Sequence, residues 1–283
     1  AYKTFVDLNP FHRLSPHFDM RVIEIYKQGG FPILVIEANK DFANSYGLKA
    51  EYWEHFDVEA FPDVLALLKD NLQELANYYH ALYQNPQFAN DRADNFQEAQ
   101  HWYREFLTSF PREDESPVMN YQFADLLLEN HHYGEAAREY ERTAYDYPQH
   151  EQAAEAGYAA VYAHRQHLQQ VDTAGEELVK RDVIRSSLRF AETFPGHDSA
   201  SLVMGAALED IFAMEDHAFA VTTGRKMLEM FPEAPESERR AAWLVVAHSS
   251  YELARYPEAE AAYLSVLALT DEADGSRREL TEN

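Results

Sequence analysis

Aromatic and small residues recur along this chain at a fixed spacing. In each copy alanine stands three positions after an aromatic residue, and a second aromatic stands four positions after that alanine. The copies are Phe96–Ala99–Tyr103, Tyr133–Ala136–Tyr140 and Tyr256–Ala259–Tyr263. Spacings of three and four place side chains on one face of an α-helix. In the first two copies a proline stands eight positions after the last aromatic, where it would end the helix.

The first two copies lie 37 residues apart, which is the length of two helices and two turns. The period and the proline stops recur along most of the chain, and no hairpin-turn dipeptide separates alternating strands. We therefore expect an all-α fold, an α-α superhelix or solenoid of about six helical hairpins without a β-sheet.

The pattern divides the chain into four parts. Residues 1–47 are expected to hold the end of one repeat and one hairpin, and 48–62 an aromatic-rich connector between two sub-arrays. Residues 63–270 form the main array, with its clearest units at 116–148 and 236–270, and 271–283 is a polar tail or the start of a further helix. Both ends would then cut through an array.

Two local features carry their own predictions. Asp63 is placed to cap a long helix that runs to about Gln84. Residues 166–175 form an insertion within one repeat, so we expect a long turn there.

The last clear unit resembles the tetratricopeptide repeat. Its consensus order of a tryptophan, an aliphatic residue, a small residue, an aromatic, alanine and an aromatic is matched by Trp243, Val246, Ala247, Tyr256, Ala259 and Tyr263. In two weaker units Ser187 and Gly224 stand where the second-helix aromatic is expected. The resemblance implies a superhelical scaffold that binds other proteins.

The sequences at the C-terminal ends of the second helices, such as residues 102–106 followed by Phe110–Pro111, resemble those of bacterial cell-envelope tetratricopeptide proteins. This likeness implies a periplasmic or outer-membrane-associated protein, with the cytoplasm as the alternative. The chain contains no cysteine, which agrees with an oxidising compartment without requiring one.

Charge narrows the choice of partner. The chain has 49 acidic and 24 basic residues, a formal net charge of -25. This charge repels the phosphates of nucleic acids and of anionic membrane surfaces. No apolar run is long enough to span a membrane. A protein or peptide with basic groups is therefore the expected partner; the sequence does not indicate an oligomeric state.

The candidate binding residues come from the resemblance, which implies that first helices line a concave groove. Counting from Ala124 and Ala247 gives two sets of four residues: Tyr121, Asp125, Leu128 and Glu129, and Leu244, His248, Tyr251 and Glu252. Their mixed apolar and acidic character suits a peptide that carries aliphatic anchors beside Lys or Arg.

Chemical alternatives have little support in the sequence. Glu129 and His132 have the spacing of two ligands of a di-iron site, and His164 and His167 have the spacing of two zinc ligands. The further ligands that either site needs are missing from the sequence. We therefore expect these histidines to be surface residues. The acidic run 113–115 is read as a solvated turn. There is no phosphate-binding loop and no nucleophile elbow.

These observations predict a non-enzymatic scaffold without cofactor or metal. Two alternatives stay open. One is a carbohydrate-binding scaffold of an exopolysaccharide or cell-wall system, because 18 tyrosines and 17 phenylalanines could supply rings to a groove. The other is a regulatory domain of a larger enzyme or transporter.

Overall fold

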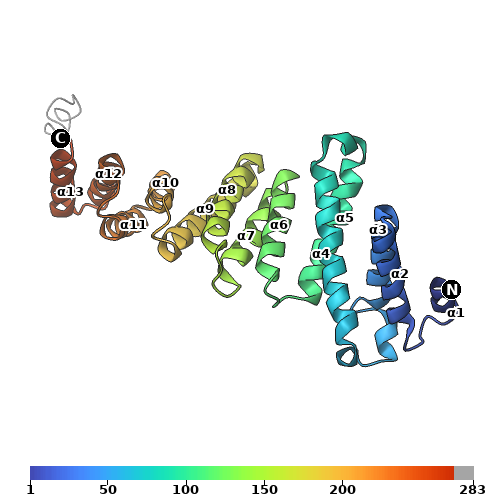
Figure 1. Ribbon diagram of the computed structural model, residues 1–283. Helices are drawn as coiled ribbons and strands as arrows, with labels where there is room; N and C mark the ends of the chain where they lie inside the picture. Colours follow the sequence, from blue (N-terminus) through green and yellow to red (C-terminus); the bar gives the residue numbers. More distant parts are fainter. Residues whose placement is uncertain (271–283) are drawn as a thin grey trace. The chain divides into compact units, whose positions relative to one another are not determined.

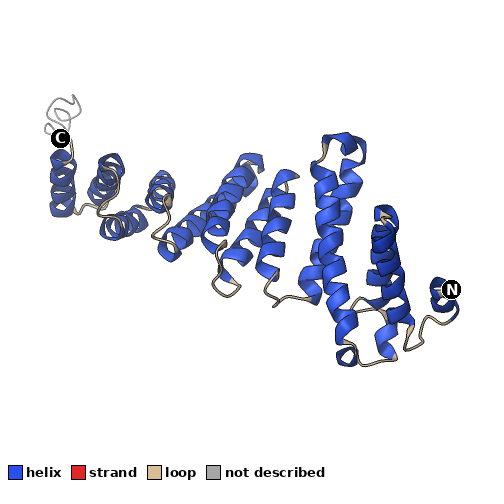
Figure 2. Ribbon diagram, viewed as in Figure 1, coloured by secondary structure: helices blue, strands red, loops and turns tan. Residues whose placement is uncertain are grey.

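The computed structural model describes residues 1–270, and within this range the chain forms thirteen α-helices, three short 3-10 helices and no strand (Figure 2). The α-helices of the first half are α1 (Tyr2–Leu8), α2 (Ser15–Gly29), α3 (Pro32–Tyr46), α4 (Pro62–Gln84), α5 (Arg92–Ser109) and α6 (Ser116–Glu129). Those of the second half are α7 (Tyr133–Tyr145), α8 (Ala153–Gln170), α9 (Thr173–Thr193), α10 (Ala200–Ala213), α11 (His217–Met230), α12 (Glu236–Glu252) and α13 (Tyr256–Ala268). The 3-10 helices are η1 (Glu51–Glu54), η2 (Val58–Ala60) and η3 (Pro86–Asp91).

The helices belong to two compact units. The first spans Ala1–His131 and contains α1 to α6, and the second begins at His132 and contains α7 to α13 (Figure 1). Within each unit every helix contacts the next one in the chain, and α10 also contacts α12. The all-α solenoid expected from the sequence is thereby confirmed. The boundary between the units falls inside the stretch 116–148.

Proline lies in the first turn of several helices or just beyond their C-terminal ends, because its lack of an N–H group disrupts the interior of a helix. It stands at the first or second position of α2, α3, α4, α6 and α13. Phe110, Phe194 and Phe231 are the C-cap residues of α5, α9 and α11, each has a φ near -125° outside the helical region, and each precedes a proline. A residue before proline is disfavoured in the helical conformation, so these helices end there.

Small residues lie where neighbouring helices approach closely. Ala136 and Ala259 are buried, as is Gly224 of α11. A Cβ atom at Gly224 would lie 2.6 Å from Cγ2 of Val246 in α12. The glycine thus permits a close α11–α12 approach at a position where the repeat pattern expects an aromatic residue.

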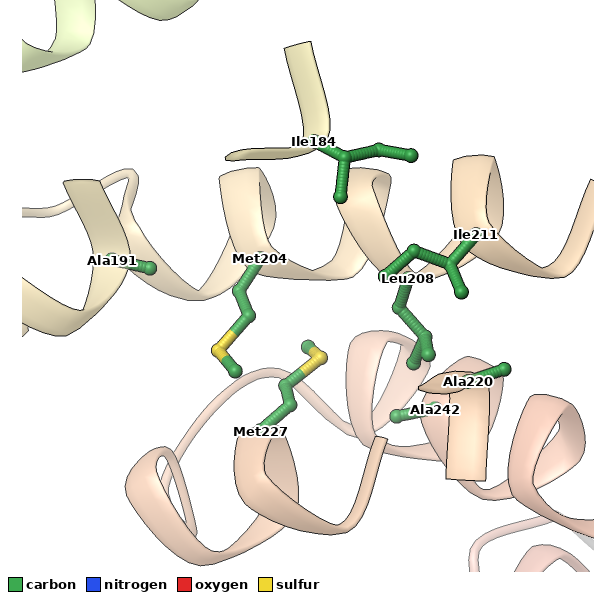
Figure 3. Packing of buried hydrophobic residues seen from close by; sticks show 8 residues of the cluster. All are labelled: Ile184, Ala191, Met204, Leu208, Ile211, Ala220, Met227 and Ala242. Carbon is green, nitrogen blue, oxygen red and sulfur yellow. The ribbon is translucent and has the colours of Figure 1, made fainter. Parts of the chain in front are cut away.

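The core of the second unit is built from side chains of four successive helices. Figure 3 shows Ile184 and Ala191 of α9, Met204, Leu208 and Ile211 of α10, Ala220 and Met227 of α11, and Ala242 of α12. The side chains of Met204 and Met227 point toward one another in this view. A core shared by successive helices is the arrangement that stabilises a stacked array.

Residues 48–62 lie inside the first unit and pack around Tyr52. The Tyr52 ring is buried and contacts Trp53, Phe56 and Phe61, with ring centroids 4.9, 4.8 and 6.3 Å away. Trp53 Nε1 donates a hydrogen bond of 3.0 Å to the carbonyl oxygen of Tyr46. The aromatic residues of this segment therefore pack it against the end of α3.

Two local predictions are wrong. Asp63 does not cap α4, because Phe61 is the N-cap residue and Pro62 starts the helix, which leaves Asp63 in the first turn. The insertion 166–175 does not form a long turn, because α8 continues to Gln170 and α9 begins at Thr173. Asp172 starts α9 by accepting a hydrogen bond from the backbone N–H of Gly175 at 3.1 Å. The alternatives for 271–283 lie outside the described residues.

Candidate functional site

The first set of sequence-predicted binding residues shares one side of α6. Tyr121, Asp125 and Leu128 are half-buried and Glu129 is exposed. Their spacing of four, three and one residues places them on neighbouring turns of the same helix face. This face combines an aromatic ring, an aliphatic side chain and two carboxylates.

Glu129 is engaged with α4 within the first unit. Gln84 Nε2 donates a hydrogen bond of 2.7 Å to Glu129 Oε1, and His80 Nε2 lies 3.6 Å from the other carboxylate oxygen. Burial lowers the pKa of the His80 ring, against the opposing effect of the Glu129 charge. Burial also raises the pKa of Tyr103, and the charges of Asp125 and Glu129 add to this shift. A cation that approaches Glu129 would therefore compete with Gln84.

The second set lies on α12 and is more open. Leu244 is half-buried, whereas His248, Tyr251 and Glu252 are exposed, and 58 % of Tyr251 is accessible to solvent. His248 Nδ1 shares a hydrogen bond of 2.9 Å with the hydroxyl oxygen of Tyr263. The imidazole is thus held in place while the other two side chains face solvent.

The two sets belong to different compact units, so each is a candidate surface by itself. The structure brings together the four residues within each set on one helix face. The first set uses a carboxylate that already has partners in its own unit, and the second offers Glu252 next to an exposed tyrosine ring.

A third surface, which the sequence analysis did not identify, is a groove in the second unit. It has a volume of about 1130 Å³ and is walled by α9, the C-terminal end of α10 and the start of α11. Its apolar side chains are Ile184, Leu188, Ile211, Ala213, Met214 and Phe219. Phe219 is 41 % exposed and Leu188 and Met214 are half-buried, so part of this apolar surface faces solvent.

Charged side chains of both signs surround the apolar part of the groove. The acidic ones are Glu176, Glu177, Glu192 and Asp216, and the basic ones are Lys180, Arg181, Arg185 and Arg189. Four acids and four bases make the groove lining neutral, in a chain whose net charge is -25. The groove is therefore much less negative than the chain as a whole.

Two rows of side chains on α9 form one wall. Arg181, Arg185 and Arg189 repeat every four residues, and the neighbouring row carries Ile184 and Leu188. The spacing of the three arginines is visible in the sequence. In so acidic a chain, this basic row could have indicated a candidate binding surface on this helix. That α10 and α11 form a groove beside this row could not be read from spacing alone, because it depends on how the helices pack.

The histidine pairs weighed as metal ligands have other surroundings. His164 is buried, not exposed as expected, because α8 packs against α7 and places its Nε2 atom 3.2 Å from Glu141 Oε1. Burial would raise the pKa of Glu141, but the hydrogen bond with His164 and the nearby positive charge of Arg185 oppose it, and the pKa is lowered. In the part of the chain that the structure describes, no three His, Asp or Glu side chains are grouped closely enough to hold a metal ion.

None of the helices between residues 1 and 270 combines the length and the apolar character needed to cross a bilayer. No protein-family model matches the chain, and no curated protein matches it. A solved structure that resembles it is a signal transduction ATPase with numerous domains, from Pyrococcus horikoshii, which carries a tetratricopeptide repeat sensor. The match has a TM-score of 0.33 and 14% identity, and covers 91% of this chain and 40% of that chain. The chain thus spans less than half the length of that protein.

Proposed function

We propose that this chain is a helical-repeat scaffold that binds a segment of another protein and acts by binding alone. The observation that carries the proposal is the groove walled by α9, α10 and α11. Its apolar side chains would bury the anchors of a partner, and its charged rim would set which partner fits. Thr173 and Glu192, nineteen residues apart on α9, both line it, so the wall is about 28 Å long. A groove of this length suits a peptide segment better than a small metabolite.

A selection from a library of random 20-residue peptides tests this proposal. The immobilised chain should enrich peptides, and Phe219→Ser should weaken their binding because Phe219 lines the groove. Leu264→Ser is the matched control, since Leu264 is also exposed but lies on α13. Failure to enrich any peptide would refute the proposal.

The acidic first-helix faces support a finer proposal about a second kind of partner segment. On α12, Glu252 lies next to the exposed ring of Tyr251, and Leu244 lies two turns away. A segment with Lys or Arg beside aliphatic anchors would complement this face. Glu252→Lys should slow association of such peptides more than it speeds their release, and raising the salt concentration should have the same effect. Glu129→Lys makes the same test on α6.

The carbohydrate alternative makes a different prediction from the same surface. Exposed rings such as Tyr251 and Tyr256, whose centroids lie 5.6 Å apart, could stack on sugars. Binding of the chain to an oligosaccharide array, abolished by Tyr251→Ala, would favour this alternative.

The cell-envelope location and the role of a regulatory domain in a larger enzyme or transporter remain proposals. The location rests on the likeness of the sequences at the ends of the second helices to those of envelope proteins and on the absence of cysteine. Fractionation of the native host, with an antibody against the chain, tests the location.

A further inference from the structure

The groove of the second unit has a charge pattern that selects one kind of occupant. Glu176 is paired with Lys180 at 2.7 Å, and Glu177 with Arg181 at 2.7 Å. The other two acids of the lining are engaged elsewhere. Glu192 contacts Lys226 of α11 at 2.6 Å, and Asp216 caps α11 by accepting from the backbone N–H of Phe219 at 3.1 Å.

In the middle of the wall the charged side chains that line the groove are both basic, Arg185 and Arg189. Arg185 contacts Asp182, which does not line the groove. Arg189 lies over the ring of Tyr145, with its guanidinium carbon 3.6 Å from the ring centroid, and has no carboxylate within ion-pair distance among residues 1–270. The stacked ring holds this arginine in place, so its donors are oriented before a partner arrives.

The ion pairs that the arginines make within α9 are easily exchanged. The side chains of Arg181 and Arg185 are 65% and 66% exposed, and their partners Glu177 and Asp182 are 72% and 28% exposed. Ion pairs with so exposed an arginine contribute little to stability. An incoming carboxylate can therefore replace an intrahelical partner at small cost. The row at 181, 185 and 189 thus offers cationic sites about 6 Å apart along the helix.

The backbone N–H and C=O groups of a bound peptide must also find hydrogen-bond partners. The walls of the groove are helices, whose N–H and C=O groups are used within the helices themselves. An extended peptide would lay unpaired backbone groups on Leu188, Met214 and Phe219, and that is costly on an apolar surface. A helical peptide pairs its own backbone groups and presents side chains every four residues, which matches the arginine row.

We infer that the groove binds an amphipathic α-helix with one apolar face flanked by a row of Glu or Asp at intervals of four residues. The apolar face would cover Leu188, Met214 and Phe219, and the acidic row would pair with Arg181, Arg185 and Arg189. This inference rests on the proposed function and names the partner of the same groove. It assigns an acidic segment to α9, in contrast to the basic segment proposed for the α12 face.

The test uses two 20-residue helical peptides with the same leucine face and blocked ends. One carries Glu at three flanking positions spaced by four, and the other carries Lys there. Binding to the full chain is measured by fluorescence anisotropy at about 0.15 M salt, where the screening length of about 8 Å limits repulsion from the net charge to nearby groups. The Glu peptide should bind roughly tenfold more tightly than the Lys peptide.

Variants separate the charge row from the groove as a whole. Arg185→Glu with Arg189→Glu should reverse the preference for the two peptides. Arg225→Glu with Arg255→Glu is the control, because these residues lie outside the groove and are also exposed. Phe219→Ser should weaken the binding of both peptides.

Several outcomes of these binding measurements would contradict the inference. Equal binding of the two peptides, tighter binding of the Lys peptide, or no binding of either would overturn the acidic-helix inference. So would arginine reversals that act no more strongly than the control. The scaffold proposal fails only if the random library also enriches no peptide.

Discussion

At the scale of single residues, the size or burial of a few side chains decides how their neighbours pack and titrate. Gly224 allows α11 and α12 to approach, because Cγ2 of Val246 occupies the place of its missing Cβ. His80 is buried between the polar groups of Tyr103, Gln84 and Glu129. Each feature gives a measurable prediction.

Gly224→Ala should destabilise the chain, although alanine favours a helix by about 1 kcal/mol over glycine. The new Cβ would lie 2.6 Å from a methyl group of Val246, which is buried and β-branched and cannot rotate away easily. Overpacking of this kind costs about 1 to 3 kcal/mol. Urea unfolding measures the net effect.

Gly205→Ala in α10 is the matched control. Its nearest atom would be the terminal Cε of Met227 at 3.3 Å, on a flexible side chain. This variant should be neutral or slightly stabilising. A parent-like stability for Gly224→Ala would show that α11 and α12 are not closely packed.

His80 makes the stability depend on pH. Its pKa is lowered in the folded chain, mainly by burial, so the unfolded chain binds a proton first as the pH falls. Stability from this group is present above the unfolded pKa of about 6.5 and is lost as the pH falls through that value toward the lower folded pKa. His80→Gln should therefore reduce the loss of stability between pH 7.5 and pH 5.5.

The exposed His101 supplies the control for this measurement. His101→Gln removes a histidine elsewhere and leaves the buried surroundings of His80 unchanged. The assignment to His80 is wrong if both variants lose stability on acidification as the parent does.

At the scale of helices, the sequence predicted the ends that proline and spacing determine. The stops after α5, α9 and α11 and the end of the long helix α4 at Gln84 follow from residue types alone, whereas the start of α4 was wrongly assigned to a cap at Asp63. The structure of residues 166–175 was not predicted correctly, because the carboxylate of Asp172 caps the start of α9 at a place where a repeat of average length would have a turn. The α9 groove depends on packing between helices, which spacing in one helix does not reveal.

The cap at Asp172 can be tested directly. Asp172→Ala should remove the hydrogen bond to the backbone N–H of Gly175 and cost about 0.5 to 2 kcal/mol. Hydrogen exchange should show the loss as faster exchange in the first turn of α9. Asp172→Asn keeps an acceptor and should behave like the parent, and equal exchange in both variants would contradict the capping role.

At the scale of the whole molecule, net charge is the dominant property. A charge of -25 makes the folded chain repel itself. Ion pairs such as Lys40–Glu98 at 2.8 Å act locally against this repulsion. The balance between the two effects determines how the chain responds to salt.

Moderate salt should raise the Tm. Between about 0.01 M and 0.1 M salt the screening length falls from about 30 Å to about 10 Å, which weakens long-range repulsion more than contacts between neighbours. A neutral osmolyte at the same osmolality controls for solvent exclusion. A Tm that falls over this range would mean that local ion pairs outweigh the repulsion.

The central claim, that a peptide segment occupies the groove of the second unit, is tested most directly by the methyl NMR signals of the six methionines. Met214 lines the groove, whereas Met119 is fully buried in α6 of the first unit. A peptide enriched from the random library should shift the Met214 signal in proportion to saturation and leave the Met119 signal in place. Saturated binding with an unmoved Met214 signal would contradict the claim.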